Sequence, residues 1–347
     1  MARVIGIVSG KGGVGKTVTA ANLGLALHEF NQDVVVVDAD LTSSNLGFYL
    51  GLYSPQPFTL QNVLNGDVNI AKAIYIHPTG LKIVPSSLAL EYVGVKANRL
   101  GEIVKHIKSG TVIVDSPAGL DREALAVLDA CNDVIVVTNP ELPAVTDALK
   151  VIHAAREKGK NILGMVVNRF KNKKHELKIS EIEMMTETPV ISVIHEDKNV
   201  KKSLFEKVPL LRYRPYSIAS LEIRRLAAML LQTEYVPPRF ARLKNLFGKY
   251  FANKYYHKHF SPLFPPQQIY SHPQYPPSFH QQPQPFQQQF SQPHFPQSPY
   301  PQALPQAYPP HEQPELKQPI FEDLDLSSAL ETKPKPKRKR GRPRKKK

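Results

Sequence analysis

Short, almost continuously apolar runs recur along the first two thirds of the chain. They cover residues 3–9, 33–38, 81–86, 111–116, 133–139, 162–168 and 189–194. A strand with one face in solvent alternates apolar and polar residues, so unbroken runs predict strands that are buried on both faces. Helical patterns, such as residues 16–30 and 145–159, lie between the runs. This alternation predicts an α/β fold with a doubly wound, mostly parallel sheet.

Polar residues follow several of the predicted strands. Gly10–Thr17 follow the first strand, Asp38 and Asp40 the second, Asp115 ends the fourth and Asn168 ends the sixth. Ligands of open parallel sheets bind beyond the carboxyl ends of the strands. We therefore expect these residues to converge on one edge of the sheet.

The composition changes after Tyr235. No acidic residue occurs between Glu234 and Glu312, and 17 of the 32 prolines lie in residues 261–320. Such a stretch buries too little apolar surface to fold by itself, so it is predicted to be disordered. The chain is accordingly divided into a folded domain (1–235), a basic amphipathic segment (236–256), a linker rich in Pro, Gln and aromatic residues (257–320), an acidic-apolar patch (321–333) and a basic tail (334–347).

Charge and cysteine content narrow the cellular setting. Ten of the net +15 charges come from residues 334–347, so the basic character belongs mostly to the tail. The single cysteine, Cys131, excludes an internal disulfide and precedes an apolar run, which predicts a core residue. No apolar run is long enough to span a membrane, and the first strand starts too early to leave room for a signal peptide. A cytoplasmic protein is expected.

The stretch GKGGVGKT at residues 10–17 has the pattern of a phosphate-binding loop between a strand and a helix. Its glycines let successive N–H groups surround phosphate oxygens, and the following helix directs its N-terminus at the same anion. Lys16 is expected to bridge the β- and γ-phosphates of a nucleotide, and the Thr17 hydroxyl to ligate Mg²⁺. Asp115 is the carboxylate expected at the magnesium.

Lys11 is a second lysine, which the minimal loop does not need. With it, the loop resembles that of the MinD/ParA family of deviant phosphate-loop ATPases, which reads K-G-G-x-G-K-[ST]. Further segments share the resemblance, among them VVVVDADLTSSNLGFYLGL, VIVDSPAGL, IVVTNPE and GMVVNRF. It covers about residues 1–233 and is closer to MinD than to ParA. It implies an ATPase that uses ATP and Mg²⁺ and forms an ATP-dependent homodimer.

The resemblance also assigns roles to single residues. Lys11 reaches the phosphates held by the partner subunit, like an arginine finger. Asp40 orients or activates the attacking water, and Asn45 contacts phosphate across the dimer. Asp38 lies near the magnesium or supports the loop.

Asn168 and Arg169 fall where the family places its adenine contacts. Two departures from the family pattern are Val18, where many relatives have a hydroxyl, and His195, where proline is usual. The expected nucleotide-binding set is Gly10, Lys11, Gly12, Gly13, Val14, Gly15, Lys16, Thr17, Val18, Asn45, Asn168 and Arg169, and the expected metal set is Thr17, Asp38 and Asp115.

Two segments after the domain suggest surfaces to which the protein attaches. Residues 239–252 place Phe240, Leu243 and further apolar side chains on one arc of a helix with cations off it, which suits an anionic membrane surface. A helix docked on its own domain is the alternative. The tail contains Arg340-Gly341-Arg342-Pro343, which resembles an AT-hook that binds DNA. A solvated tail, or one directed at anionic lipid, is the alternative.

The resemblance implies a switch of the MinD type. It binds ATP, dimerises, attaches to the inner face of the membrane and positions the cell-division machinery or another large assembly. Hydrolysis is expected to be slow until a further, unidentified protein engages. The alternative is a ParA-like DNA-binding ATPase that partitions chromosomes or plasmids, or associates with the nucleoid, through its basic tail.

Overall fold

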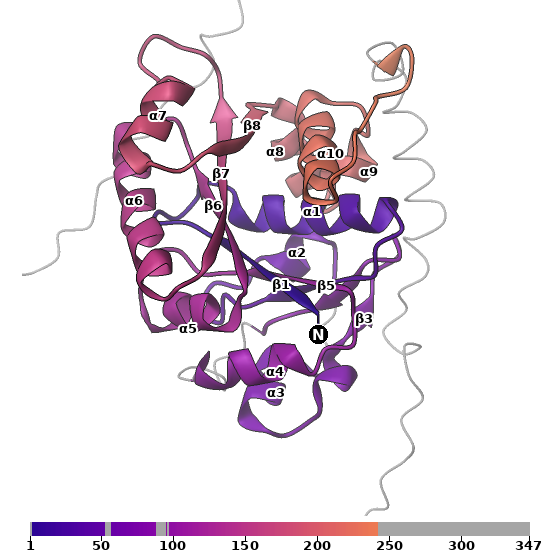
Figure 1. Cartoon of the computed structure of the whole chain (residues 1–347). Coiled ribbons are helices and arrows are strands. Elements are labelled where there is room, and N and C mark those ends of the chain that lie inside the picture. Colours follow the sequence, from indigo (N-terminus) through magenta and orange to yellow (C-terminus); the bar gives the residue numbers. More distant parts are fainter. Residues whose placement is uncertain (1, 53–56, 88–94, 96, 242–347) are drawn as a thin grey trace, which may run out of the picture. The chain divides into compact units, whose positions relative to one another are not determined.

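A twisted eight-stranded sheet forms the centre of the computed structural model, which describes residues 2–52, 57–87, 95 and 97–241 (Figure 1). The strand order is β3-β4-β2-β5-β1-β6-β7-β8. All neighbouring strands run parallel except β3 and β4. The strands are β1 (Arg3–Val8), β2 (Val34–Asp38), β3 (Tyr75–Ile76), β4 (Lys82–Val84), β5 (Thr111–Asp115), β6 (Asp133–Thr138), β7 (Asn161–Phe170) and β8 (Val190–His195).

The predicted doubly wound α/β fold is confirmed. Each of the seven predicted runs contains a strand. Among the strands that the structure describes, the sequence pattern missed only β3, whose two residues pair antiparallel with β4 at one edge of the sheet. A strand this short has no periodicity to detect.

Helices cover both faces of the sheet (Figure 1). Residues of α1, α2, α9 and α10 share one buried apolar cluster with the strands, and residues of α3 to α7 share the other. Helix α8 lies beside α9 and α10. The helices are α1 (Lys16–Glu29), α2 (Leu46–Tyr49), α3 (Leu60–Asn65), α4 (Leu100–Lys105), α5 (Arg122–Ala130), α6 (Leu142–Glu157), α7 (Ile179–Thr186), α8 (Lys198–Phe205), α9 (Leu210–Tyr213) and α10 (Ile218–Leu230), with 3₁₀ turns η1 (Ile70–Ala73) and η3 (Ala97–Arg99).

Strand β2 shows why the strands are apolar at every position. Successive side chains of a strand point to opposite faces. Val35 and Val37 belong to one apolar cluster, and Val34 and Val36 belong to the other. Both faces of the sheet are therefore core, as the unbroken apolar runs predicted.

Helix α1, which follows the glycine-rich loop, is held very close to the sheet. A Cβ atom on Gly24 would lie 2.4 Å from Cγ2 of Val36, so a larger residue would force the helix away from the strand. On its outer side α1 packs against α10, which explains why α1 is buried almost all round. The loop that precedes α1 is thereby fixed at the carboxyl end of β1.

His77 fastens the end of α2 to the turn between β3 and β4. Its ring is buried, with Nε2 2.7 Å from the carbonyl oxygen of Leu50 and Nδ1 2.8 Å from the Thr79 hydroxyl. The carbonyl only accepts, so Nε2 carries the proton, and Nδ1 accepts a bond from the Thr79 N–H at 3.2 Å. Burial lowers the pKa of His77 to about 4.

Several predictions concern other parts of the chain. Cys131 is buried, as expected, and burial raises its pKa to about 12. None of the helices that the structure describes is both long and apolar enough to cross a bilayer. The amphipathic segment 239–252 lies outside the described residues from Arg242 onward, as do the linker, the acidic-apolar patch and the AT-hook-like tail. Those assignments stay predictions.

We predict that acid weakens the fold through His77. The unfolded ring binds a proton near pH 6.5 and the folded ring only near pH 4, so stability is complete above pH 6.5 and falls as the pH drops through this window. The loss is at most about 3 kcal/mol. Urea unfolding of the wild type and of His77→Gln between pH 4.5 and 7.5 measures it. Equal pH slopes in the two proteins would contradict the prediction.

Candidate functional site

The glycine-rich loop leaves β1 at Ser9 and enters α1 at Lys16, as predicted. Gly13 and Gly15 adopt positive φ angles of 77° and 103°, which L-residues with a Cβ rarely adopt. Gly10 has no room for a side chain, because a Cβ atom there would lie 2.1 Å from the carbonyl oxygen of Asp147 in α6. The glycines therefore let the backbone turn tightly while α6 packs directly against it.

Lys16 is buried at the base of this loop. Its ammonium donates to the Ser9 hydroxyl at 2.9 Å, and Ser9 donates in turn to the Lys11 carbonyl at 2.8 Å. Burial lowers the pKa of Lys16, whereas the charges of Asp115 and then of Asp40 raise it. Ser9 was missed by the sequence reasoning, although it directly precedes the loop.

Asp115 ends β5 beside the loop and fits a metal site. Asp115 is 1% exposed, and hydrogen bonding from the Thr17 side chain opposes the rise in its pKa that burial causes. Its Oδ1 atom has no hydrogen-bond partner in the structure. A buried carboxylate oxygen without a partner beside a hydroxyl is the kind of hard oxygen donor pair that Mg²⁺ takes. Thr17 and Asp115 therefore fit the expected magnesium, which lends positive charge to the phosphates when it is bound.

Asp38 lies next to Asp115, since the two residues are register partners in β2 and β5. Its carboxylate accepts from the Ser44 hydroxyl at 2.7 Å and from the backbone N–H groups of Asp40 at 3.2 Å and Leu46 at 3.3 Å. Burial raises the pKa of Asp38 to about 7, and the hydrogen bond from Ser44 opposes this shift. These contacts hold the segment after β2 and not the phosphate loop. Both expected roles of Asp38, at the metal and in support of the loop, stay predictions.

Buried charge at this edge favours a cation. Burial and the neighbouring charge of Asp38 raise the pKa of Asp115. The Lys16 ammonium interacts with the charges of Asp115 and Asp40, and a nucleotide's phosphates would add negative charge beside them. A divalent cation would offset that added charge.

The segment after β2 forms one wall of the site. Asp40 is half-buried, and its Oδ1 accepts from the Ser43 N–H at 2.8 Å and from the Thr42 hydroxyl at 3.3 Å. Asn45 is exposed and donates to the Ser43 carbonyl. Both residues line the same cleft as Lys16 and Thr17, and for Asp40 this agrees with the predicted convergence of the strand ends. Their roles toward water and phosphate stay predictions.

Asn168 reaches the loop from β7. Its amide donates to the Val14 carbonyl at 2.7 Å, and a Cβ atom on Gly15 would lie 2.3 Å from its nitrogen. Asn168 and Arg169 also line a small side cavity of about 60 Å³ that continues toward His195 and α8. The sheet edge thus brings these residues beside the loop, and their contact with adenine stays a prediction.

Lys11 differs from Lys16 in its exposure and in the contacts of its ammonium group. It is exposed, and its ammonium makes no hydrogen bond or ion pair with any residue that the structure describes. Its carbonyl, by contrast, is fixed by Ser9. The loop therefore holds the Lys11 backbone in place while leaving its charge free in solvent.

A cleft of about 600 Å³ is lined by Lys16, Thr17, Asp40, Asn45 and Arg169 among the predicted site residues. Lys11, Asp38, Asp115 and Asn168 do not belong to its lining. Its volume suits a nucleotide. Four lining residues come from α2 and from α8 with the turn after it, and sequence reasoning did not identify them. They are Phe48, Tyr49, Leu204 and Lys207. The last two lie far along the chain from the loop and belong to no motif, so only the fold reveals them.

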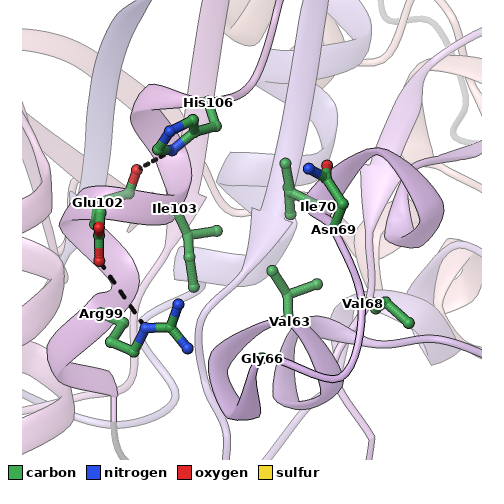
Figure 2. Close-up of a pocket in the computed structure, with 9 residues that line it drawn as sticks. All are labelled: Val63, Gly66, Val68, Asn69, Ile70, Arg99, Glu102, Ile103 and His106. Atoms are coloured by element: carbon green, nitrogen blue, oxygen red, sulfur yellow. Dashed lines mark hydrogen bonds and ion pairs between the residues drawn. The ribbon is translucent and has the colours of Figure 1, made fainter.

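A second cavity, of about 350 Å³, lies between α3 and α4 (Figure 2). Its apolar residues include Val63, Ile70 and Ile103. The Arg99 guanidinium at its rim already donates to the Leu64 carbonyl at 3.0 Å and lies 3.9 Å from Glu102. None of its lining residues comes from the loop or from the strand ends beside it, so we assign the nucleotide to the first cleft.

Comparisons with known proteins agree with this geometry. The sequence model of the CobQ/CobB/MinD/ParA nucleotide binding domain matches residues 5–210. An uncharacterized ATP-binding protein of Methanocaldococcus jannaschii is 40% identical over 238 residues, which cover 68% of this chain and 90% of that protein.

Solved structures show the same similarity. The cell division ATPase MinD of Pyrococcus furiosus matches with a TM-score of 0.64 and 33% identity, over 67% of this chain and 99% of that one. The septum site-determining protein MinD of Pyrococcus horikoshii, complexed with Mg-ADP, matches with a TM-score of 0.63 and 34% identity, over 66% and 96%.

We predict that Lys16→Ala lowers the affinity for ATP by about 100-fold, because a charge-assisted contact to phosphate is lost and the carboxylates of Asp115 and Asp40 lose a neighbouring cation. Titration with a fluorescent ATP analogue measures the change. Lys158→Ala removes a surface lysine that pairs with Asp129 and serves as the control. Binding by Lys16→Ala within twofold of the wild type would contradict the assignment of the cleft.

Proposed function

The chain belongs to the CobQ/CobB/MinD/ParA family of nucleotide-binding proteins, and on that premise we propose that it is an ATP-dependent dimerisation switch of the MinD type. ATP and Mg²⁺ are the cofactors of the family. In the proposed cycle, the ATP-bound chain pairs with a second copy, attaches to a surface and is released after hydrolysis. Its role is to position a large assembly, such as the division machinery.

The observation that carries the proposal is the contrast between the two lysines of the loop. Lys16 is buried and pairs with groups of its own chain, whereas Lys11 is held by its backbone and points its charge into solvent. A cation fixed this way beside an open cleft is available to phosphates held by another subunit. It would stabilise the charge that develops when the γ-phosphate is transferred to water.

Asp40 is the group we assign to the attacking water. It lines the cleft near Lys16, is half-buried, and keeps one carboxylate oxygen, Oδ2, outside the hydrogen bonds from Thr42 and Ser43. A carboxylate oxygen in such a position can accept a hydrogen bond from water and orient it. Its neighbour Asp38 holds the backbone of the same segment, so it positions Asp40.

We predict that Lys11→Ala separates binding from dimerisation. Affinity for ATP should stay within about twofold, because the exposed Lys11 ammonium makes no hydrogen bond or ion pair with the described part of its own chain. ATP-dependent dimerisation should disappear, and hydrolysis should fall about 1000-fold, as when an arginine finger is removed. Sedimentation with an ATP analogue and phosphate-release assays measure both effects.

Lys174→Ala is the matched control, since it also removes an exposed lysine at this end of the sheet, in the loop after β7. It should dimerise and hydrolyse ATP like the wild type. A Lys11→Ala protein that forms dimers and hydrolyses ATP at the wild-type rate would refute the function in trans.

The surface to which the protein attaches is inferred from the sequence after residue 235. Two copies of the amphipathic segment 239–252 in one dimer would convert weak single contacts into stable attachment, which makes binding depend on ATP. The ten cations of residues 334–347 favour DNA as the second candidate surface, since clustered Lys and Arg bind phosphate backbones.

We predict that ATP promotes co-sedimentation with vesicles containing phosphatidylglycerol. The full chain and a chain ending at residue 333 should bind, and a chain ending at residue 236 should not, because it lacks the amphipathic segment.

Mobility shifts with duplex DNA test the tail in the same three proteins. If the chain ending at 236 binds vesicles as well as the full chain does, membrane attachment through 239–252 is wrong. If DNA affinity depends on residues 334–347 and the full chain does not bind vesicles, the ParA-like alternative is favoured.

A further inference from the structure

The cavity between α3 and α4 has an apolar interior and a charged edge (Figure 2). Its lining residues Val63, Ile70 and Ile103 are buried, and Figure 2 shows their side chains between the two helices. Arg99, Glu102 and His106 line it from η3 and α4. A volume of about 350 Å³ falls in the range of about 300–1,000 Å³ that ligand pockets occupy. The cavity is therefore large enough to take apolar side chains of a binding segment.

Cations outnumber carboxylates on the two segments that frame this cavity, residues 63–72 and 99–108. Arg99 lies 3.9 Å from Glu102. The other cations are exposed lysines, and they form no ion pair within the part of the chain that the structure describes. The cations are Lys72, Arg99, Lys105 and Lys108, and the carboxylates are Asp67 and Glu102. This excess of positive charge favours a partner that carries carboxylates.

One segment beyond the described residues has the matching chemistry. Residues 320–326 read IFEDLDL and combine four large apolar side chains with three carboxylates. Ile320, Phe321 and Leu324 are spaced so that they would share one face of a helix, as in peptides that bind apolar grooves. No other stretch of this length in residues 242–347 combines several carboxylates with several large apolar side chains. The acidic-apolar patch is thus the part of the tail that suits the cavity.

The chain is long enough to bring this segment to the cavity. Residues 242–319 separate it from Ala241, the last residue that the structure describes. An unstructured chain of that length spans about 50 Å on average, whereas a domain of about 240 residues has a radius of gyration of about 18 Å. Because segment and cavity belong to one molecule, their effective concentration is on the order of 1 mM. Even a weak contact would therefore be formed most of the time.

We propose that residues 320–326 dock in the cavity between α3 and α4 of their own domain. The apolar side chains enter the cavity, and the carboxylates lie toward the cations of residues 63–72 and 99–108. This site is separate from the nucleotide cleft, since the two share no lining residue. Residues 327–333 join the docked segment to the basic tail, so docking holds the start of that tail within about 25 Å of the cavity.

The test uses the full chain and changes only residues outside the domain, so the folded part keeps its own sequence. Phe321→Ser combined with Leu324→Ser removes two apolar side chains from the docking segment. Leu263→Ser combined with Phe264→Ser makes the same two changes in the linker and is the matched control.

Amide hydrogen exchange, followed by mass spectrometry, is the first readout. We expect α3 and α4 to exchange about tenfold faster in the variant of the docking segment than in the wild type, because a bound segment lowers the population of locally opened states. The linker variant should match the wild type. Exchange in β1 and β5 should be equal in all three proteins, which shows that the domain itself is unchanged.

Cross-linking with a carbodiimide, which joins carboxylates to amines in direct contact, is the second readout. In the monomeric product of the wild type, we expect links from the carboxylates of residues 322–325 to lysines beside the cavity, namely Lys72, Lys105 or Lys108. The variant of the docking segment should lose these links, and the linker variant should keep them.

Equal exchange of α3 and α4 in all three proteins would overturn the proposal. Links that reach only the lysines of residues 334–347 would overturn it as well, because the acidic segment would then pair with the neighbouring basic tail and leave the cavity free. Links to Lys72, Lys105 or Lys108 that occur only in a covalent dimer would overturn docking within one chain.

Discussion

A buried ammonium group beside the buried carboxylate of Asp115 organises the functional edge of the sheet. Lys16 is desolvated at the base of the phosphate loop, and Asp38 and Asp115 lie side by side at the ends of β2 and β5. Buried charges are tolerable only when partners and hydrogen bonds compensate for the lost water. Ser9, Thr17 and Ser44 supply such bonds, and the unpartnered oxygen of Asp115 leaves a position for a metal.

Close packing at two glycines brings these groups together. Gly24 lets α1 approach β2, and Gly10 lets α6 touch the loop, so the loop is clamped between two helices. The clamp explains how Lys11 can be both fixed and exposed. Its backbone belongs to the loop held between the two helices, while its side chain extends into solvent.

The segment from Asp38 to Leu50 lies along the cleft and is attached to the rest of the domain at both ends. Asp38 holds its beginning through backbone N–H groups, Tyr49 holds its end through buried hydroxyl bonds, and His77 fixes the carbonyl of Leu50 just beyond. The residues with expected roles in hydrolysis, Asp40 and Asn45, lie between these attachments. The hydrogen bond from the Leu210 N–H to Tyr49 joins the end of this segment to α9.

The sequence by itself determined the sheet, the loop and the convergence of polar strand ends. These features depend on local periodicity and on the topology of parallel strands, both of which are readable from one chain. Only the tertiary structure decided that Asp38 bonds its own loop, that Asn168 holds the Val14 carbonyl, and that Tyr49, Leu204 and Lys207 belong to the cleft. The physical reason is that such contacts join residues as far apart as Asn22 and Leu211, whose proximity depends on how helices pack and leaves no periodic mark in the sequence.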